Sequence, residues 1–173
     1  RPARARAVGC ATCETMAHAA CPSPSAVMPQ AAVEAVTGWI DTHCHLYTPR
    51  DFPDIRATIA EAQIAGVERM VVIGVNPKTS ELAVKLADEH PEIFAVVGHH
   101  PTSTATFQDS DLKLYADLYA HPKVLAIGEI GLDYYWDKAT PEQQDRALRA
   151  QLDLAESLGA PIVYHCRDAY DAL

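Results

Sequence analysis

From residue 38 onward, hydrophobic and polar positions follow two different patterns. Short, nearly continuous apolar runs are followed by longer segments in which apolar residues recur every three or four positions. The first pattern predicts strands buried on both faces, and the second predicts amphipathic helices that cover them. The predicted strands are 38–44, 69–74, 94–98, 124–128 and 161–164, and the predicted helices are 54–65, 78–89, 109–120 and 141–158, with a further helix beginning at Asp168.

Cap signals separate these elements and give them a regular spacing. Gly66 and Gly159 each follow a predicted helix, and Thr140 before Pro141 is typical of a helix N-cap with proline in the first turn. The predicted strand ends, near residues 45, 75, 99, 129 and 165, are about one strand–helix unit apart. This order predicts a parallel α/β sheet.

Polar residues at the ends of several strands favour one architecture over another. In a (β/α)8 barrel all carboxyl ends of the strands surround one site, whereas a doubly wound sheet has a crevice served by fewer strands. The first strand is not followed by a glycine-rich phosphate loop. We therefore predict a TIM-type barrel, with the doubly wound sheet as the alternative. The polar residues are His43, His45, Asn76, His99, His100, Glu129, Asp133, His165 and Arg167.

The number of predicted strands falls short of a closed barrel. A TIM-type barrel has eight strands, and an open arc of five would leave unpaired edges. We expect residues 38–173 to be the N-terminal portion of a metallohydrolase barrel, truncated at the C-terminus after about the first five strands. Residues 1–37 are rich in Ala, Pro and Arg without a consistent period, and we expect a disordered or artefactual extension, with Met16 and Met28 as alternative starts.

Charge and length limit the classes of function. The net charge is −9, and the first 37 residues contribute +1, so the remainder carries −10. An acidic surface argues against a broad, sequence-independent grip on nucleic acid, although bound cations can still create a local phosphate site. No apolar run is long enough to span a membrane, and no obligatory protein partner is evident.

The cysteines favour a reducing compartment. Cys44 lies between two histidines and Cys166 follows another, which suits reduced thiols in a cytoplasmic protein better than a disulfide framework. Cys10 and Cys13, with Cys21 nearby, form a weak zinc-site pattern, because the spacing is poor and no strand or helix surrounds it.

The His-x-His motif at the end of the first strand is the strongest candidate for metal binding. His43 and His45 should leave the same face of what we expect to be a short buried strand, Trp39 and Ile40. Two neutral imidazoles at this spacing can share one divalent ion. The motif alone is weak, because a chain with eight histidines can contain it by chance.

Later strand ends supply further candidates. Glu129 directly follows an apolar strand, and a carboxylate there can bridge two cations; an ordinary charged strand exit is the alternative. Gly128 and Gly131 flank it and suggest close packing. His165 ends the fifth strand, and Arg167 can clamp a phosphate or pair with a neighbouring aspartate.

Two more features lie at the same predicted rim. His99 and His100 follow the third strand, and His100, held extended by the following proline, is a candidate substrate contact. Tyr134, Tyr135 and Trp136 form either loop packing or a stacking surface for a planar group.

Four ordered motifs give a specific resemblance. They are Asp41-Thr-His-Cys-His-Leu46, Val97-Gly-His-His-Pro101, Gly128-Glu-Ile-Gly-Leu-Asp133 and His165-Cys-Arg-Asp-Ala169. Together they resemble the TatD-type metal-dependent deoxyribonucleases, which are amidohydrolase-like (β/α)8 barrels. The resemblance covers about residues 38–173.

The resemblance implies a dinuclear metallohydrolase that cleaves phosphodiester bonds of DNA, of the 3'-5' type, with two Mg2+, Mn2+ or Zn2+ ions. His43 and His45 would bind one ion, Glu129 would bridge both, and His165 would bind the second. Substrate contacts would come from His100, Asp133 and Arg167. The family's catalytic aspartate, and a further histidine, would lie beyond residue 173. His99 departs from the family, which more often has an apolar residue there.

Two alternatives remain open. Amidohydrolases acting on small esters or amides commonly bridge their metals with a modified lysine on the fourth strand, and Glu129 at this position favours the nuclease branch. The other alternative is a catalytically incomplete fragment that binds one metal weakly.

Overall fold

The computed structural model describes residues 38–48 and 50–173. Five parallel strands form one sheet in the order β1-β2-β3-β4-β5, so that each strand lies beside the next in sequence. The strands are β1 (Trp39–Cys44), β2 (Val67–Ile73), β3 (Ile93–Val97), β4 (Val124–Asp133) and β5 (Ile162–Arg167). The helices are α1 (Ile55–Ile64), α2 (Pro77–Glu89), the 3-10 helix η1 (Pro101–Thr106), α3 (Asp109–Tyr119) and α4 (Pro141–Leu158).

The predictions for residues 1–37, including the extension, the alternative starts and the Cys10–Cys13 zinc site, lie outside the described residues.

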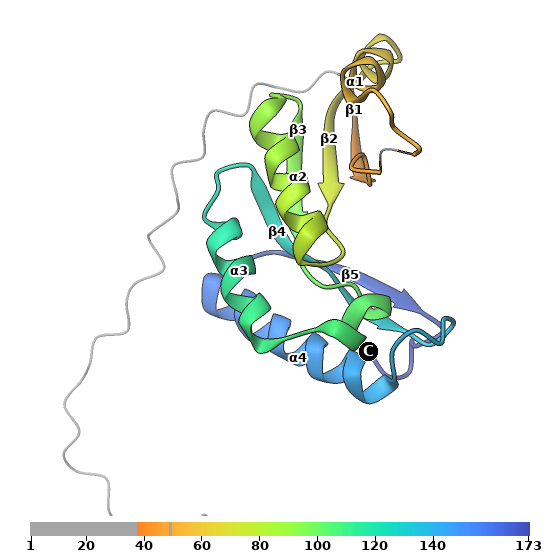
Figure 1. Ribbon diagram of the computed structural model, residues 1–173, viewed down its shortest axis with the longest axis vertical. Helices are drawn as coiled ribbons and strands as arrows, with labels where there is room; N and C mark the ends of the chain where they lie inside the picture. The colour runs from red at the N-terminus through yellow and green to blue at the C-terminus, as the bar shows by residue number, and fades with distance from the viewer. Residues whose placement is uncertain (1–37, 49) are drawn as a thin grey trace, which may run out of the picture. The chain divides into compact units, whose positions relative to one another are not determined.

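The strand order identifies the sheet as part of a barrel. A doubly wound sheet reverses its strand order at a switch point and carries helices on both faces. Here the order never reverses, and α2, α3 and α4 lie on the same side of the sheet (Figure 1). The predicted α/β barrel architecture is therefore confirmed, with five strands among the described residues.

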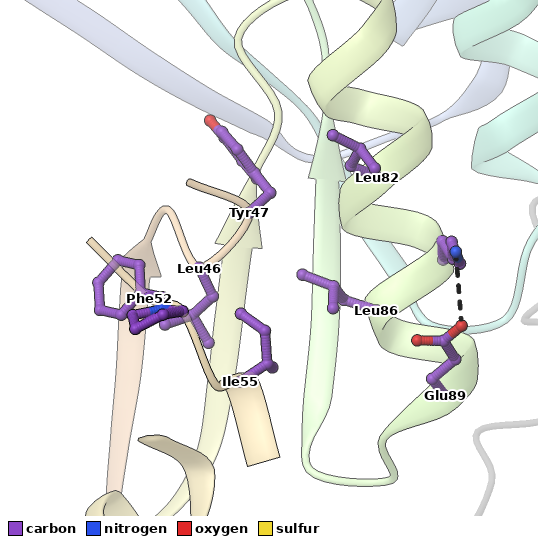
Figure 2. A pocket seen from close by; sticks show the side chains of 9 residues that line it. Leu46, Tyr47, Phe52, Ile55, Leu82, Leu86 and Glu89 are labelled. Atoms are coloured by element: carbon purple, nitrogen blue, oxygen red, sulfur yellow. Dashed lines mark ion pairs between the residues drawn. The ribbon is translucent and has the colours of Figure 1, made fainter. Parts of the chain in front are cut away.

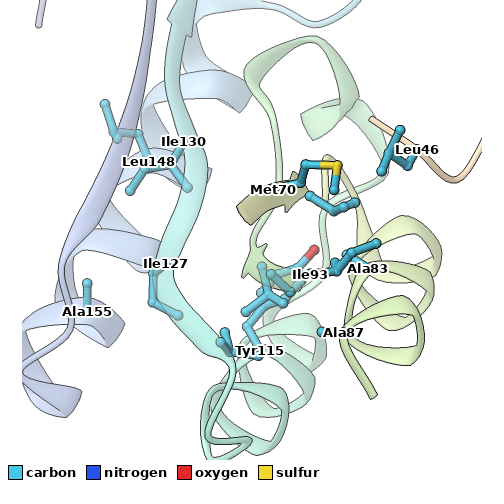
Figure 3. Packing of buried hydrophobic residues seen from close by; sticks show 14 of the residues in the cluster. Leu46, Met70, Ala83, Ala87, Ile93, Tyr115, Ile127, Ile130, Leu148 and Ala155 are labelled. Carbon is cyan, nitrogen blue, oxygen red and sulfur yellow. The ribbon is translucent and has the colours of Figure 1, made fainter. Parts of the chain in front are cut away.

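Alternate residues of β2 and β3 enter two separate apolar clusters. Met70 and Val72 of β2 join residues of the helices in the larger cluster, whereas Val71 and Ile73 belong to a smaller cluster on the opposite face. Figure 3 shows the larger cluster between the sheet and the helices. Burial on both faces explains the continuous apolar runs of β2 and β3.

The two edge strands are more exposed than the sequence suggests. The predicted burial of Trp39 and Ile40 is wrong: 75% of Trp39 and 47% of Ile40 are exposed. The reason is that β1 pairs only with β2. At the other edge, Tyr164 of β5 is half exposed.

Strand β4 is longer than predicted, reaching Asp133 instead of ending at residue 128. The close packing expected at Gly128 and Gly131 is the close pairing of β4 with β5. A Cβ on Gly131 would collide with the backbone carbonyl of His165, and its φ of 151° also favours glycine. The two strands therefore stay paired to the end, where Asp133 lies opposite Arg167.

The helix ends agree closely with the cap signals. Gly66 and Gly159 have positive φ after α1 and α4, and Thr140 forms a capping box with Gln143. The helix predicted from Asp168 is reduced to one turn, in which the amide of Leu173 donates to the carbonyl of Ala169. Within the described part of the chain, no helix has the length and apolar character needed to cross a membrane.

Candidate metal centre

The histidines and the glutamate named above converge at the carboxyl ends of the strands. His43 is in β1, His45 follows it, Glu129 is in β4, and His165 is in β5. His100 lies three residues after the end of β3. Parallel strands bring these ends together although the residues are far apart in sequence.

The first group consists of His43, His45 and Glu129. One ligand atom from each lies within 4.8 Å of the others. His43 Nε2 is 3.3 Å from Glu129 Oε2, and the two histidine rings have centroids 5.2 Å apart. Two imidazole nitrogens and one carboxylate oxygen are a suitable donor set for a divalent transition metal or zinc.

Two residues outside this group, Ile73 and Tyr47, orient the ring of His45. Its Nδ1 lies 3.0 Å from the carbonyl oxygen of Ile73, which can only accept, so Nδ1 carries the hydrogen. The Tyr47 hydroxyl lies 2.9 Å from the same nitrogen and donates to the same carbonyl at 2.8 Å. The lone pair of Nε2 is thereby left for a metal.

Tyr47 was missed in the sequence, although its position two residues after His45 was a usable signal. Burial raises the pKa of Tyr47 to about 12, so that it remains a neutral hydroxyl. It supports His45 as a hydrogen-bonding neighbour.

The second group consists of His100, Glu129 and His165, again with ligand atoms within 4.8 Å. His165 Nδ1 is 3.0 Å from Glu129 Oε1 and 3.0 Å from His100 Nε2. Burial, reinforced by His165, lowers the pKa of His100 to about 4, so the ring is neutral near pH 7. Each oxygen of Glu129 therefore faces a different histidine, one from β1 and one from β5.

Asp133 is buried behind His165. Its Oδ2 is 2.8 Å from His165 Nε2, and its Oδ1 accepts the backbone N–H groups of Tyr135 and Trp136. Burial alone would raise the pKa of Asp133, but the Trp136 N–H and His165 hold it below its usual range. With both oxygens engaged, Asp133 is better placed to orient His165 than to contact substrate.

Two buried glutamines of α4, which the sequence analysis missed, hydrogen-bond to the backbone at or just after strand ends. Gln144 accepts from the amide of Asp133 and donates to its carbonyl. Gln151 makes the same pair of bonds with His99. The usable signal was two uncharged polar residues seven positions apart on the apolar face of α4.

Two residues adjacent to the ligand candidates point away from the centre. His99 is only 1% exposed and bonds to the Ser103 carbonyl and the Tyr115 hydroxyl, so it does not share the rim with His100. Burial raises the pKa of Cys44 to about 12, and its thiol donates to the Val71 carbonyl.

Arg167 lies at the rim, beyond Asp133. Among the described residues it forms no ion pair with Asp168 or Asp171. Its guanidinium carbon instead lies 3.7 Å from the centre of the Tyr135 ring.

An apolar pocket of about 250 Å³ lies beside the first group. None of the candidate ligands lines it (Figure 2), but Tyr47, one of its lining residues, hydrogen-bonds to His45. Its other walls come from the segment after β1 and from α2, including Leu46, Phe52, Ile55, Leu82 and Leu86.

Comparisons with known proteins agree with this geometry. The sequence model of a family described as TatD related DNase matches residues 40–173. The chain is 40% identical over 129 residues to YabD of Bacillus subtilis, an uncharacterized metal-dependent hydrolase, covering 75% of this chain and 51% of that protein. It is 39% identical over 113 residues to the 3'-5' ssDNA/RNA exonuclease TatD of Escherichia coli K12, covering 65% and 44%.

Solved structures show the same fold. The crystal structure of YjjV, a TatD homolog from Escherichia coli K12, superposes with a TM-score of 0.72 and 33% identity, covering 78% of this chain and 53% of that one. A TatD family hydrolase from Entamoeba histolytica, at 22% identity and a TM-score of 0.70, covers 81% and 53% and supports the fold alone. The chain spans about half the length of the relatives it matches.

Proposed function

This chain belongs to the TatD-related DNase family, and from that premise we propose that its centre serves divalent-metal-dependent phosphodiester hydrolysis, with single-stranded DNA shortened from its 3' end. The observation that carries the proposal is the position of Glu129. Its Oε2 faces His43 and its Oε1 faces His165. A buried carboxylate between histidines of two strands is suited to joining two cation sites.

The donor chemistry fits two divalent ions. His43, His45 and Glu129 would hold one, and Glu129, His165 and His100 would hold the other. Tyr47 and Asp133 contact the histidines rather than the ligand positions, as is common around metal-binding imidazoles. Nitrogen and oxygen donors together leave Mg2+, Mn2+ and Zn2+ as candidates.

Cations held there would supply Lewis acidity toward phosphate oxygens and would lower the pKa of water. The chain's own residues would set the geometry. Glu129 keeps the two groups together, and the Ile73 carbonyl fixes the tautomer of His45. Arg167 lies at the rim, where a guanidinium can bind a phosphate of the substrate.

The proposal is tested with a 5'-labelled single-stranded oligonucleotide and added Mg2+ or Mn2+. We expect stepwise shortening that stops in EDTA and falls at least about a hundredfold in Glu129→Gln, which removes a charged ligand. His121→Ala, at a histidine that belongs to neither metal group and is paired with Asp88, is the matched control and should retain wild-type activity. Cleavage that is equally fast in EDTA or in Glu129→Gln would overturn the proposal.

A second candidate function is metal binding without turnover. It stays open because the chain spans only about half the length of its relatives. A wild-type chain that is stabilised by Mn2+ but shortens no oligonucleotide would support it. The proposed location is the cytoplasm, where Cys44 and Cys166, both free thiols, would remain reduced.

A further inference from the structure

Two aromatic rings and two cations cluster at the rim of the metal centre. Tyr135 and Trp136 are 53% and 47% exposed, and their ring centroids are 4.9 Å apart. Arg167 lies over the Tyr135 ring, and Lys138 Nζ is 5.5 Å from the centre of the Trp136 ring. We call these four residues the rim platform.

The rim platform is tied to the metal centre by hydrogen bonds. Asp133 Oδ1 accepts the N–H groups of Tyr135 and Trp136, while its Oδ2 bonds to His165. The carbonyl of Arg167 accepts the N–H of Tyr134, which joins the ends of β4 and β5. The buried carboxylate of Asp133 thus contacts both the ring of His165 and the backbone of the segment that carries Tyr135 and Trp136.

The chemistry of the rim platform is unusual for this acidic chain. Large aromatic side chains that are solvent-exposed next to one another commonly mark a binding surface. Neither Arg167 nor Lys138 is paired with a carboxylate in the part of the chain that the structure describes. Exposed rings provide stacking surfaces, and cations beside them attract phosphates.

We infer that the rim platform binds an unpaired nucleobase next to the phosphodiester held at the metal centre. This inference rests on the proposed function and deepens it, because it assigns the preference for single strands to named residues. In the interior of a duplex both faces of each base are covered by its neighbours, and at a blunt end the terminal base is still held by its partner. Stacking on Tyr135 or Trp136 therefore requires a base that has left the helix, as at a single-stranded end.

The test compares two oligonucleotides with the same phosphates, an oligothymidylate and its abasic counterpart, in Mn2+. We expect wild type to show a kcat/KM about fivefold or more higher for the oligothymidylate. Tyr135→Leu should lose this preference through a higher KM for the oligothymidylate, so that its kcat/KM becomes the same for the two strands. Tyr135→Phe keeps the ring and should behave like wild type.

A second readout does not depend on catalysis. The chain has two tryptophans, so Trp39→Phe, at an exposed position of β1, leaves Trp136 as the single reporter. In EDTA, oligothymidylate should quench its fluorescence and the abasic strand should not, and Tyr135→Leu should weaken the quenching.

The outcomes separate the two proposals. Equal metal-dependent cleavage of both strands by wild type, or a preference unchanged in Tyr135→Leu, would overturn the platform and leave the proposed function standing. If wild type cleaves neither strand, the proposed function fails, and the quenching of Trp136 alone decides for or against the platform.

Discussion

His165 Nε2 lies 2.8 Å from Asp133 Oδ2, and this contact turns the opposite nitrogen of the ring, Nδ1, toward Glu129. Both ring nitrogens face carboxylate oxygens, which can only accept. When Nδ1 binds a cation, the contact with Asp133 would keep the proton on Nε2. The lowered pKa of Asp133 keeps it ionised near neutral pH. We therefore predict that Asp133, which is buried, orients the ring of His165 for metal binding.

Asp133→Asn should therefore weaken metal binding while leaving every ligand in place. Loss of an outer partner of a ligating histidine typically lowers affinity by about 10- to 100-fold, and we expect a loss in this range for Mn2+ by isothermal titration calorimetry. The matched control is Asp137→Asn, which removes the same charge from an exposed position of the following loop. Equal affinities of the two variants would contradict the orienting role.

Metal stoichiometry should distinguish the two histidine groups. We expect two Mn2+ per chain in wild type and one in His43→Ala or His165→Ala, because each removes a ligand from one group. Glu129→Gln should weaken both sites, since its oxygens face both groups. The measurement is Mn2+ binding followed by electron paramagnetic resonance, in which magnetic coupling between two ions should disappear in all three variants. Retention of two coupled ions in His165→Ala would show that the second site is wrongly assigned.

The sequence was sufficient to predict the barrel and the convergence of the histidines. Continuous apolar runs follow from burial on both faces, and parallel strands end at the same rim. It could also have separated His99 from His100, because successive side chains of an extended chain leave opposite faces. His100 faces the centre and His99 the core.

Other features depended on contacts between residues far apart in sequence. The carbonyl that orients His45 belongs to Ile73, and the side chain that clamps Asp133 comes from Gln144. No local pattern encodes such pairs. The length of β4 was missed because the continuous apolar run ends at Gly128, whereas the pairing that extends the strand to Asp133 depends on β5.

Gln151→Leu should destabilise the fold. The side chain bonds to both the amide and the carbonyl of His99 in a fully buried position. A leucine would leave both backbone groups unpaired, and we expect a loss of about 2–4 kcal/mol in the free energy of unfolding. Urea unfolding followed by circular dichroism measures this.

Gln63→Leu is the control for this change. Gln63 is exposed and bonds to Glu92 at the surface, so its replacement should cost less than about 0.5 kcal/mol. A Gln151→Leu protein as stable as the Gln63→Leu protein would show that the clamp on His99 contributes nothing.

Gly131→Ala should damage both the fold and the metal centre. The new Cβ would meet the carbonyl of His165, and the backbone of β5 would have to move away from β4. We expect a loss of roughly 2–3 kcal/mol in unfolding free energy and weaker Mn2+ binding, because His165 would move relative to Glu129. Gly159→Ala is the matched control: its φ of 62° also disfavours alanine, but no atom lies within 4 Å of the added Cβ. That variant should lose about 1 kcal/mol and bind Mn2+ like wild type, so equal metal affinity in both alanine variants would contradict a role for the β4–β5 approach in placing His165.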